Sequence, residues 1–257
     1  MNKKGPLACG PFPVSLPSGT YFACAKHRWS RGSRSNYNDL DARKSMPFVY
    51  NQDSQSAFHV TLSRDRLNPY VATSNGDFVA AMLLYEFNTK ASEALYGVLQ
   101  ALEVAYRNAC YSVLANGMGQ ANWYDTIGLL DAKEAVALGE AKVKIGRRNK
   151  YLTPGRVVAE LTFGFWVRLL SPGYEKRLWV PHLYKAFSGM YKKDRQVAFG
   201  RMENIRKLRN RVAHHETIFD RNLNLDYAEI LEAINWICPV TAAWIRSTNS
   251  FAIRGYL

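Results

Sequence analysis

An apolar stripe with helical spacing runs from Ser92 to Ala115, and it constrains the fold more than any other feature of the sequence. Its positions recur every three or four residues, which is the period of one face of an α-helix. The stripe is wide, so we expect this helix to lie at the centre of the domain. Its members are Leu95, Val98, Leu99, Leu102, Ala105, Tyr106, Ala109, Cys110 and Val113.

The other regular patterns are also helical, and no segment alternates apolar and polar residues as a half-exposed strand does. The sequence therefore predicts an all-α protein. Residues 171–190 form a connection broken by Pro and Gly. The other expected helices are 63–67, ended by Asn68-Pro69, then 77–94, 131–145, 153–170, 195–215, and 226–246, which Asp226 caps and Pro239 kinks.

Residues 1–57 differ from the rest of the chain, because they are rich in Pro, Ser, Asn and Arg and have no sustained apolar period. A segment that cannot bury an apolar face tends to stay disordered. We expect a basic, disordered extension over residues 1–57 and one helical domain over residues 58–257. The basic and aromatic groups of the extension could alternatively contact RNA.

The chain is strongly basic, with a formal net charge of +13 from 34 Lys and Arg against 21 Asp and Glu. Residues 1–45 hold eight of these cations against two Asp, so the excess is shared between the extension and the helical domain. Such a charge balance favours an anionic partner, and RNA is the partner that we expect ahead of DNA or a membrane surface.

The four cysteines are scattered along the chain without any C-x-x-C pair, which favours a reducing compartment and no zinc site. Cys110 and Cys238 lie in apolar helical contexts and are expected to be buried thiols. No run of about 18 apolar residues predicts a membrane span, and no apolar signal core follows Lys3-Lys4. We therefore expect a cytoplasmic protein without a cofactor.

The segment from Arg206 to Glu216 concentrates the groups that carry chemistry. It combines four cations with an amide, two imidazoles and a carboxylate. An apolar stripe of Ile205, Leu208 and Val212 predicts a helix with one buried face. On that helix Asn210 and His214 are i, i+4 neighbours on the polar face, whereas Arg209 lies roughly 140° from His214.

These residue types suit the cleavage of a phosphodiester. An imidazole can accept or release a proton near neutral pH, an Arg can hold two phosphate oxygens, and an Asn can orient a neighbour or donate to an oxyanion. We therefore name Arg209, Asn210 and His214 as catalytic candidates that need no metal, since the adjacent His214 and His215 point apart on a helix. The alternative is a solvated basic helix face that happens to contain histidines.

Gln100, Glu103 and Arg107 form a narrow polar stripe on the central helix. Glu103 and Arg107 are an i, i+4 pair in the favourable order. The stripe is either an exposed ion pair of little energetic weight or a polar island that faces the candidate catalytic helix.

The densest basic run of the helical domain lies at the end of the helix expected at 131–145. It is the best candidate for contact with a nucleic-acid backbone, although cations at a helix C-terminus also complement the helix dipole. Its members are Lys142, Lys144, Arg147, Arg148 and Lys150.

The run Arg209-Asn210-Arg211-Val212-Ala213-His214 matches the ribonuclease motif of the HEPN superfamily, and the longer segment through Ile218-Phe219 resembles its Abi-like branch of abortive-infection proteins, of the AbiD and AbiF type. Three other segments resemble signatures of that branch. These are Tyr85–Asn88 with Leu102–Ala109, Trp123-Tyr124, and Leu161–Trp166. The resemblance covers roughly residues 58–250.

The resemblance implies a HEPN-type helical bundle with additional helices, and a metal-independent endoribonuclease that acts in phage defence. It implies a homodimer in which two motifs form the site, with Phe163–Trp166 in the core or in the dimer contact. RNA is the implied substrate, and a small structured RNA could also bind. With Arg209, Asn210 and His214 as the catalytic set, the supporting residues would be Glu103, Arg107, His215 and Glu216, and Arg206 and Arg211 would join the basic run in binding RNA.

Two other functions fit the same pattern. The first is a non-catalytic RNA-binding protein, or a toxin–antitoxin component, that acts by binding a structured RNA or a partner protein. The second is the HEPN partner of a nucleotidyltransferase. In that subgroup a Tyr stands two residues after the motif His, whereas this chain has Glu216 there, which argues against it.

Overall fold

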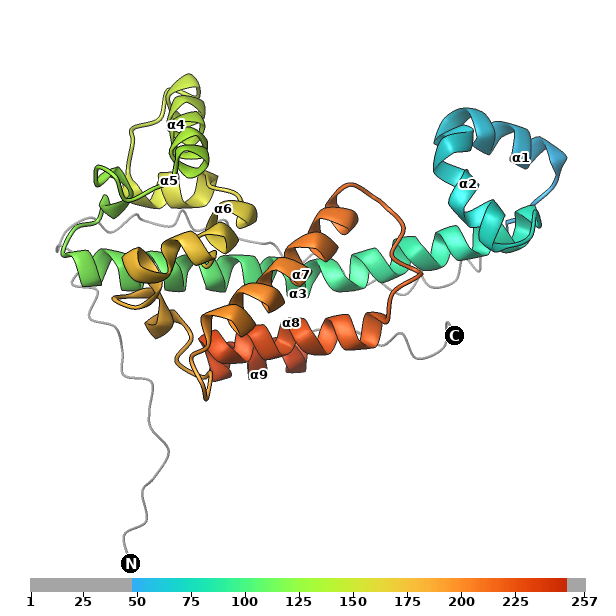
Figure 1. Ribbon diagram of the computed structural model, residues 1–257. Coiled ribbons are helices and arrows are strands. Elements are labelled where there is room, and N and C mark those ends of the chain that lie inside the picture. The colour runs from blue at the N-terminus through green and yellow to red at the C-terminus, as the bar shows by residue number, and fades with distance from the viewer. Residues whose placement is uncertain (1–47, 249–257) are drawn as a thin grey trace, which may run out of the picture. The chain divides into compact units, whose positions relative to one another are not determined.

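The computed structural model describes residues 48–248, and within them the regular structure is entirely helical (Figure 1). The fold is therefore all-α, as predicted. Short 3-10 or π-helical turns lie at His59–Ser63, Trp123–Asp125, Pro172–Tyr174, Glu175–Trp179 and Leu183–Ala186. The α-helices are α1 (Gln52–Phe58), α2 (Arg64–Thr73), α3 (Phe78–Met118), α4 (Ala132–Arg147), α5 (Pro154–Glu160), α6 (Phe163–Arg168), α7 (Arg195–Ala213), α8 (Leu223–Ile237) and α9 (Pro239–Thr248).

The central element is α3, a single helix of 41 residues that is about 60 Å long at 1.5 Å per residue. It joins the two helical patterns expected at 77–94 and 92–115. Ser92 lies inside the helix, where its hydroxyl donates to the carbonyl of Asn88, one turn earlier, at 2.8 Å. Asp77 caps the first turn, and Gly119 ends the helix in the left-handed conformation.

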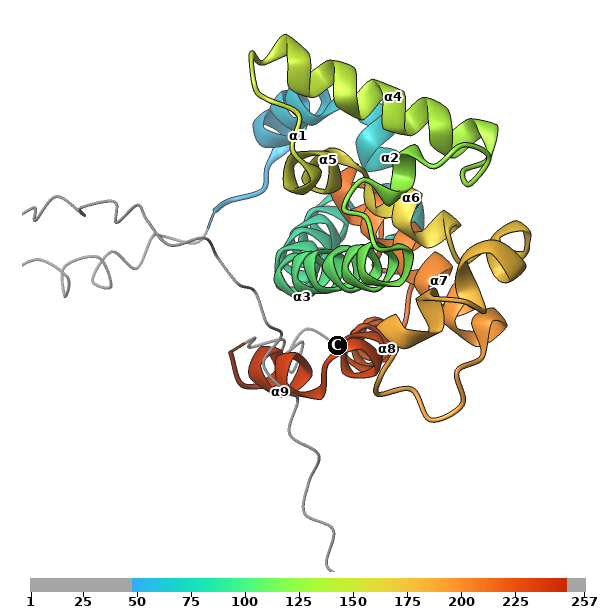
Figure 2. The same ribbon diagram turned by 90° about the vertical axis from the view of Figure 1, so that its left-hand side faces the viewer.

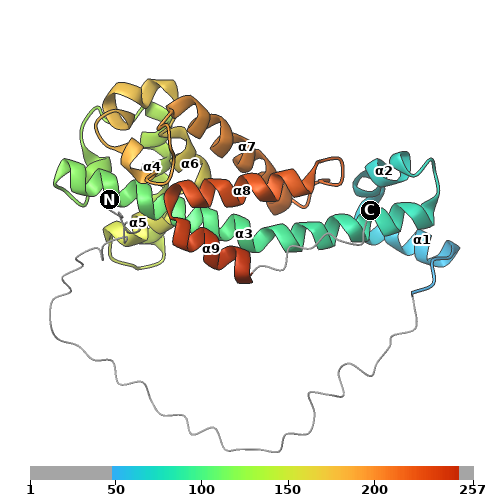
Figure 3. The same cartoon turned by 90° about the horizontal axis from the view of Figure 1, so that it is seen from below.

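The other helices are arranged along α3. As Figures 1 and 3 show, α8 runs beside the middle of α3, α7 crosses it, and α9 folds back against α8. At the C-terminal end of α3, α4, α5 and α6 cover one side (Figure 2). The first helices, α1 and α2, pack at its N-terminal end.

The predicted apolar stripe of α3 forms the core of this bundle. Leu95, Leu102, Tyr106 and Cys110 are fully buried, and the hydroxyl of Tyr106 donates to the carbonyl of Trp166 at 3.0 Å. The side chains of Phe163, Phe165 and Trp166 belong to the same core. The segment Phe163–Trp166 is therefore a core element of its own chain, which leaves its large side chains unavailable for a dimer contact.

Two expectations about the N-terminal helices are wrong. Residues 52–57, placed by sequence in the disordered extension, form most of α1, which Asn51 caps through the amide of Ser54. The helix expected to end at Asn68-Pro69 continues to Thr73, with Pro69 inside it. Leu67 and Tyr70 on either side of this proline are buried, so their packing outweighs the lost backbone hydrogen bond. Residues 1–47 of the expected extension lie outside the described residues.

Two helices expected to be continuous are divided. The helix expected at 153–170 breaks into α5 and α6, because Leu161 is extended and Thr162 starts α6 by accepting the amide of Phe165 at 3.3 Å. The helix expected at 226–246 stops at Ile237, since Cys238 is extended and Pro239 begins α9. Proline suits the first position of a helix, where its missing N–H has no partner to lose.

Three side chains of this C-terminal region, those of Asp226, Trp244 and Cys238, also differ from their expected roles. Asn222 rather than Asp226 caps α8, by accepting the amide of Leu225, and Asp226 instead pairs with Arg221 at 2.5 Å. Trp244 was expected in the core, but 59% of its surface is exposed. Cys110 is buried as predicted, and burial raises its pKa to about 12, whereas Cys238 is only partly buried.

Candidate functional site

The helix that carries the sequence motif, α7, forms as predicted along its buried side. Asp194 caps it by accepting the amides of Gln196 and Val197 at 2.7 and 3.2 Å. The predicted stripe of Ile205, Leu208 and Val212 is buried against the core that α3, α6 and α8 share with α7. This packing fixes α7 across α3, with the motif at its C-terminal end.

The end of α7 differs from the prediction. The helix stops at Ala213, so neither His214 nor His215 lies on a helix face. The amide of Glu216 donates to the carbonyl of Arg211 at 2.8 Å, and the amide of His215 donates to that of Val212 at 3.2 Å. This pair of bonds is a Schellman motif, and His215 occupies its left-handed position with a φ of 57°.

Side chains from α2 and α3 hold this turn in place. Asn88, a buried residue of α3, donates from its amide nitrogen to the carbonyl of Glu216 at 3.3 Å and accepts the amide of Ile218 at 2.6 Å. Arg66 of α2 donates to the carbonyl of His215. The backbone around His215 is therefore fixed by bonds from two other helices.

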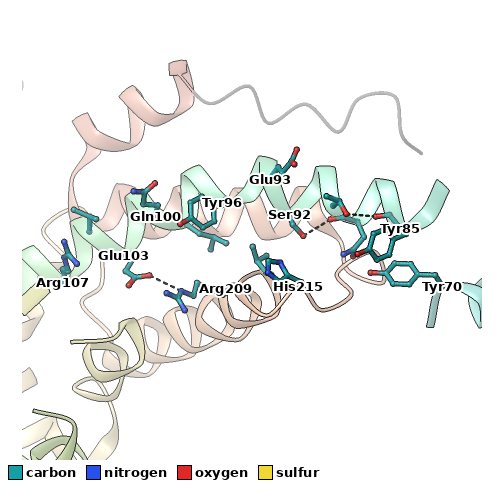
Figure 4. Close-up of a pocket in the computed structure, with 16 residues that line it drawn as sticks. Tyr70, Tyr85, Ser92, Glu93, Tyr96, Gln100, Glu103, Arg107, Arg209 and His215 are labelled. Carbon is teal, nitrogen blue, oxygen red and sulfur yellow. Dashed lines mark hydrogen bonds and ion pairs between the residues drawn. The ribbon is translucent and has the colours of Figure 1, made fainter. Parts of the chain in front are cut away.

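A cleft of about 770 Å³ opens between α3 and the end of α7, with α2 at one end (Figure 4). It is lined by groups that interact with nucleotides elsewhere, namely Arg, His and Tyr side chains. The residues that line it are Tyr70, Tyr85, Asn88, Thr89, Ser92, Glu93, Tyr96, Leu99, Gln100, Glu103, Val104, Arg107, Arg209, Val212, Ala213 and His215.

The polar stripe of α3 faces α7 in this cleft, as one of the two sequence interpretations expected. Arg209 donates from Nε to Glu103 at 3.2 Å, and both side chains keep part of their surface exposed. Glu103 makes no ion pair with Arg107, its neighbour on the same helix. Instead the Nε atom of Arg107 is buried in the cleft wall without a hydrogen-bond partner among the described residues.

The structure brings together only some of the predicted site residues. Arg209, Glu103, Arg107 and His215 line the cleft, and Figure 4 shows Arg209 and His215 on the α7 side of it, facing α3. The remaining predicted members, Asn210, His214 and Glu216, are not among the residues that line it. His214 and Glu216 are exposed, and Asn210 is half-buried.

The basic run on α4 lies apart from this cleft, above the C-terminal end of α3 (Figures 1 and 2). Lys142 pairs with Asp125, and Lys144 and Arg148 pair with Glu160 at 2.6 and 2.9 Å. These cations lower the pKa of the Glu160 carboxyl, chiefly through the hydrogen bond from Lys144. Arg147 and Lys150 are exposed and make no ion pair within residues 48–248.

The two other arginines expected to bind RNA are also paired. Arg206 makes two hydrogen bonds of 2.7 Å to Glu203, and Arg211 pairs with Asp220 at 2.8 Å. Each guanidinium can therefore bind a phosphate only if it also keeps its carboxylate partner or breaks that ion pair. None of the predicted RNA-binding cations is among the residues that line the cleft.

Three residues of the site, namely Asn88, Arg66 and Tyr70, had no predicted role. For Asn88 the sequence did hold a signal, since it lies on the otherwise apolar side of a long helix. A buried amide there needs hydrogen-bond partners from another segment. Tyr70 is almost fully buried, yet it lines the cleft, and its hydroxyl makes no hydrogen bond among the described residues. Burial raises the pKa of Tyr70 to about 12, so this hydroxyl stays protonated at neutral pH.

None of the helices between residues 48 and 248 combines the length and the apolar character that crossing a membrane requires. In the same part of the chain, no three His, Cys, Asp or Glu side chains gather in a way that could hold a metal ion. Comparison of the chain with protein-family models, curated proteins and solved structures returned no match.

Proposed function

We propose that this protein is a cytoplasmic, metal-independent endoribonuclease of the Abi-like HEPN type, and that it acts in defence against phage. One observation carries the proposal: α3 and α7 meet through Glu103 and Arg209 in an open cleft that Arg107 and His215 also line. Arg209 of the sequence motif and the polar stripe thus share one accessible site. The excess of positive charge on the chain supports an RNA partner.

The proposed chemistry is attack of a ribose 2′-OH on its own phosphodiester. Arg209 would neutralise the charge that develops on the phosphate, because a guanidinium can hold two of its oxygens. His214 would transfer a proton to or from the reacting oxygens, and Asn210 would orient one of these groups. The products would be a 2′,3′-cyclic phosphate and a free 5′-hydroxyl.

The chemistry is tested by incubating the purified protein with RNA in the presence of EDTA. We expect cleavage to persist and the new 3′ ends to be 2′,3′-cyclic phosphates. A matched oligonucleotide with one 2′-deoxyribose at the cut site should resist, because it lacks the nucleophile. Loss of cleavage in EDTA, or cutting of the deoxy substrate at the same rate, would contradict the proposed mechanism.

The position of His214 outside the cleft supports a homodimer, in which a second chain brings its own motif to the cleft of the first. In such a dimer the reacting site combines Arg209 of one chain with His214 of the other. Mixing Arg209→Ala with His214→Ala should then restore part of the cleavage that each variant alone lacks, because one of the two sites in a mixed dimer is intact. Both variants unmixed are the controls, and sedimentation should give a dimer.

If the mixture stays as inactive as its components while the wild-type protein cleaves, the site is built within one chain and the dimer proposal fails.

The second candidate function is RNA binding without cleavage. It is favoured by the position of His214 outside the cleft and by the pairing of Arg209 with Glu103, which leaves the cleft close to neutral. RNA that binds the wild-type protein and Arg209→Ala differently, but that neither protein cuts, would support this alternative.

A further inference from the structure

We infer that His215, and not only the motif histidine His214, is a catalytic group, and that it acts as the general base of the Arg209 cleft. This inference rests on the proposed ribonuclease function. It assigns the removal of the 2′-OH proton to a residue that sequence reasoning placed among the supporting ones.

The first observation is the backbone of His215. Its φ of 57° lies in the left-handed region, which costs a non-Gly residue about 1 kcal/mol or more. Gly is the usual residue at this position of a Schellman motif. A His at that place therefore costs stability, and such strain persists where the side chain is needed and the surroundings enforce the conformation.

The second observation is that two helices enforce this conformation. Asn88 binds the carbonyl of Glu216 and the amide of Ile218, and Arg66 binds the carbonyl of His215 itself. Together with the two Schellman bonds, these contacts fix the backbone on both sides of the residue. Asn88 and Arg66 are positioning residues for the imidazole.

The third observation is where the side chain goes. His215 lines the cleft together with Arg209, and Figure 4 shows both facing α3, with His215 opposite Ser92. Tyr70, whose hydroxyl makes no hydrogen bond among the described residues, lines the cleft beyond His215, next to Tyr85. A ligand that extends along the cleft from Arg209 therefore meets an imidazole of the same chain and, beyond it, an unused hydroxyl donor.

The reaction balances with the groups named. Neutral His215 takes the proton of the 2′-OH as the 2′ oxygen bonds to phosphorus. The bond from phosphorus to the 5′ oxygen breaks, and that oxygen takes a proton from protonated His214 of the second copy in the proposed dimer. One imidazole thus accepts a proton and the other donates one. Each returns to its starting protonation state by proton exchange with water.

The test uses His215→Gly, which removes the imidazole while suiting the left-handed turn. We expect cleavage to fall by about 10²-fold or more, the melting temperature to stay the same or rise, and added free imidazole to restore part of the activity. Asn149→Gly is the matched control, because Asn149 ends α4 in the same left-handed turn with a φ of 53°. That variant should cleave like the wild-type protein and should not respond to imidazole.

The outcomes separate the inference from the function on which it rests. If the wild-type protein cleaves RNA and His215→Gly cleaves equally well, the role of His215 is overturned and the proposed function stands. The role is also overturned if His215→Gly is inactive but imidazole restores nothing. A wild-type protein that does not cleave RNA would overturn both.

Discussion

Replacing Arg209 by Ala should lower RNA cleavage by about 10²-fold or more, which is the usual cost of removing a group that stabilises developing charge. Arg209 is the one residue of the predicted catalytic set that lines the cleft. Its loss also leaves the carboxylate of Glu103 without its cation, and this negative charge would repel a phosphate. The rate should be measured with a labelled oligonucleotide under single-turnover conditions, where product release does not limit it.

Arg201→Ala is the matched control for this experiment. Arg201 lies on the same helix and pairs with Glu229 and Glu232 of α8, away from the cleft. That variant should keep the wild-type rate. If Arg209→Ala cleaves within a few-fold of wild type, the guanidinium does not stabilise the transition state, and the proposed site is incorrect.

The largest loss of stability at the site is expected for Asn88→Ala, at about 2–3 kcal/mol. The substitution removes the partner of the buried Ile218 amide and that of the Glu216 carbonyl, and an unsatisfied buried donor costs about 1–3 kcal/mol. The free energy of unfolding should be measured by urea denaturation. Cleavage should fall as well, because the turn that carries His215 loses its support.

Asn108→Ala provides the comparison, since Asn108 is an exposed residue of the same helix. Its effect should stay within about 0.5 kcal/mol, as is usual for surface substitutions. Equal stabilities for the two variants would mean that the Asn88 hydrogen bonds do not hold the turn.

Much of the fold could be predicted from the sequence, because the signals are local. The apolar stripes of α3 and α7 follow the helical period, and each becomes a buried face. The placement of the polar stripe opposite α7 was one of two open interpretations, and the pair of Glu103 with Arg209 decides between them. Apolar periodicity alone says which face of a helix is buried but not which helix covers it.

The remaining features depend on contacts between distant residues, which a single sequence does not reveal. No Gly follows α7 to mark its end at Ala213 in the sequence. The turn there is stabilised by Asn88 and Arg66, which lie more than 100 residues earlier. The break between α5 and α6 comes from a Thr cap inside an apolar run. The cations of α4 are partly neutralised by Asp125 and Glu160, which sequence spacing did not link to them.

The pair between Arg209 and Glu103 also bears on how the cleft selects what enters it. A carboxylate already occupies the guanidinium, so an incoming phosphate gains only the difference between two similar charge-assisted hydrogen bonds. Small free anions make few contacts besides their charge, so they should compete poorly with Glu103 for Arg209. An extended chain whose sugars and bases reach Tyr70, Tyr96 and the rest of the wall could outcompete the carboxylate. The ion pair would thus weaken the binding of simple anions to the cleft. Selectivity would then depend more on the shape of the ligand than on its charge.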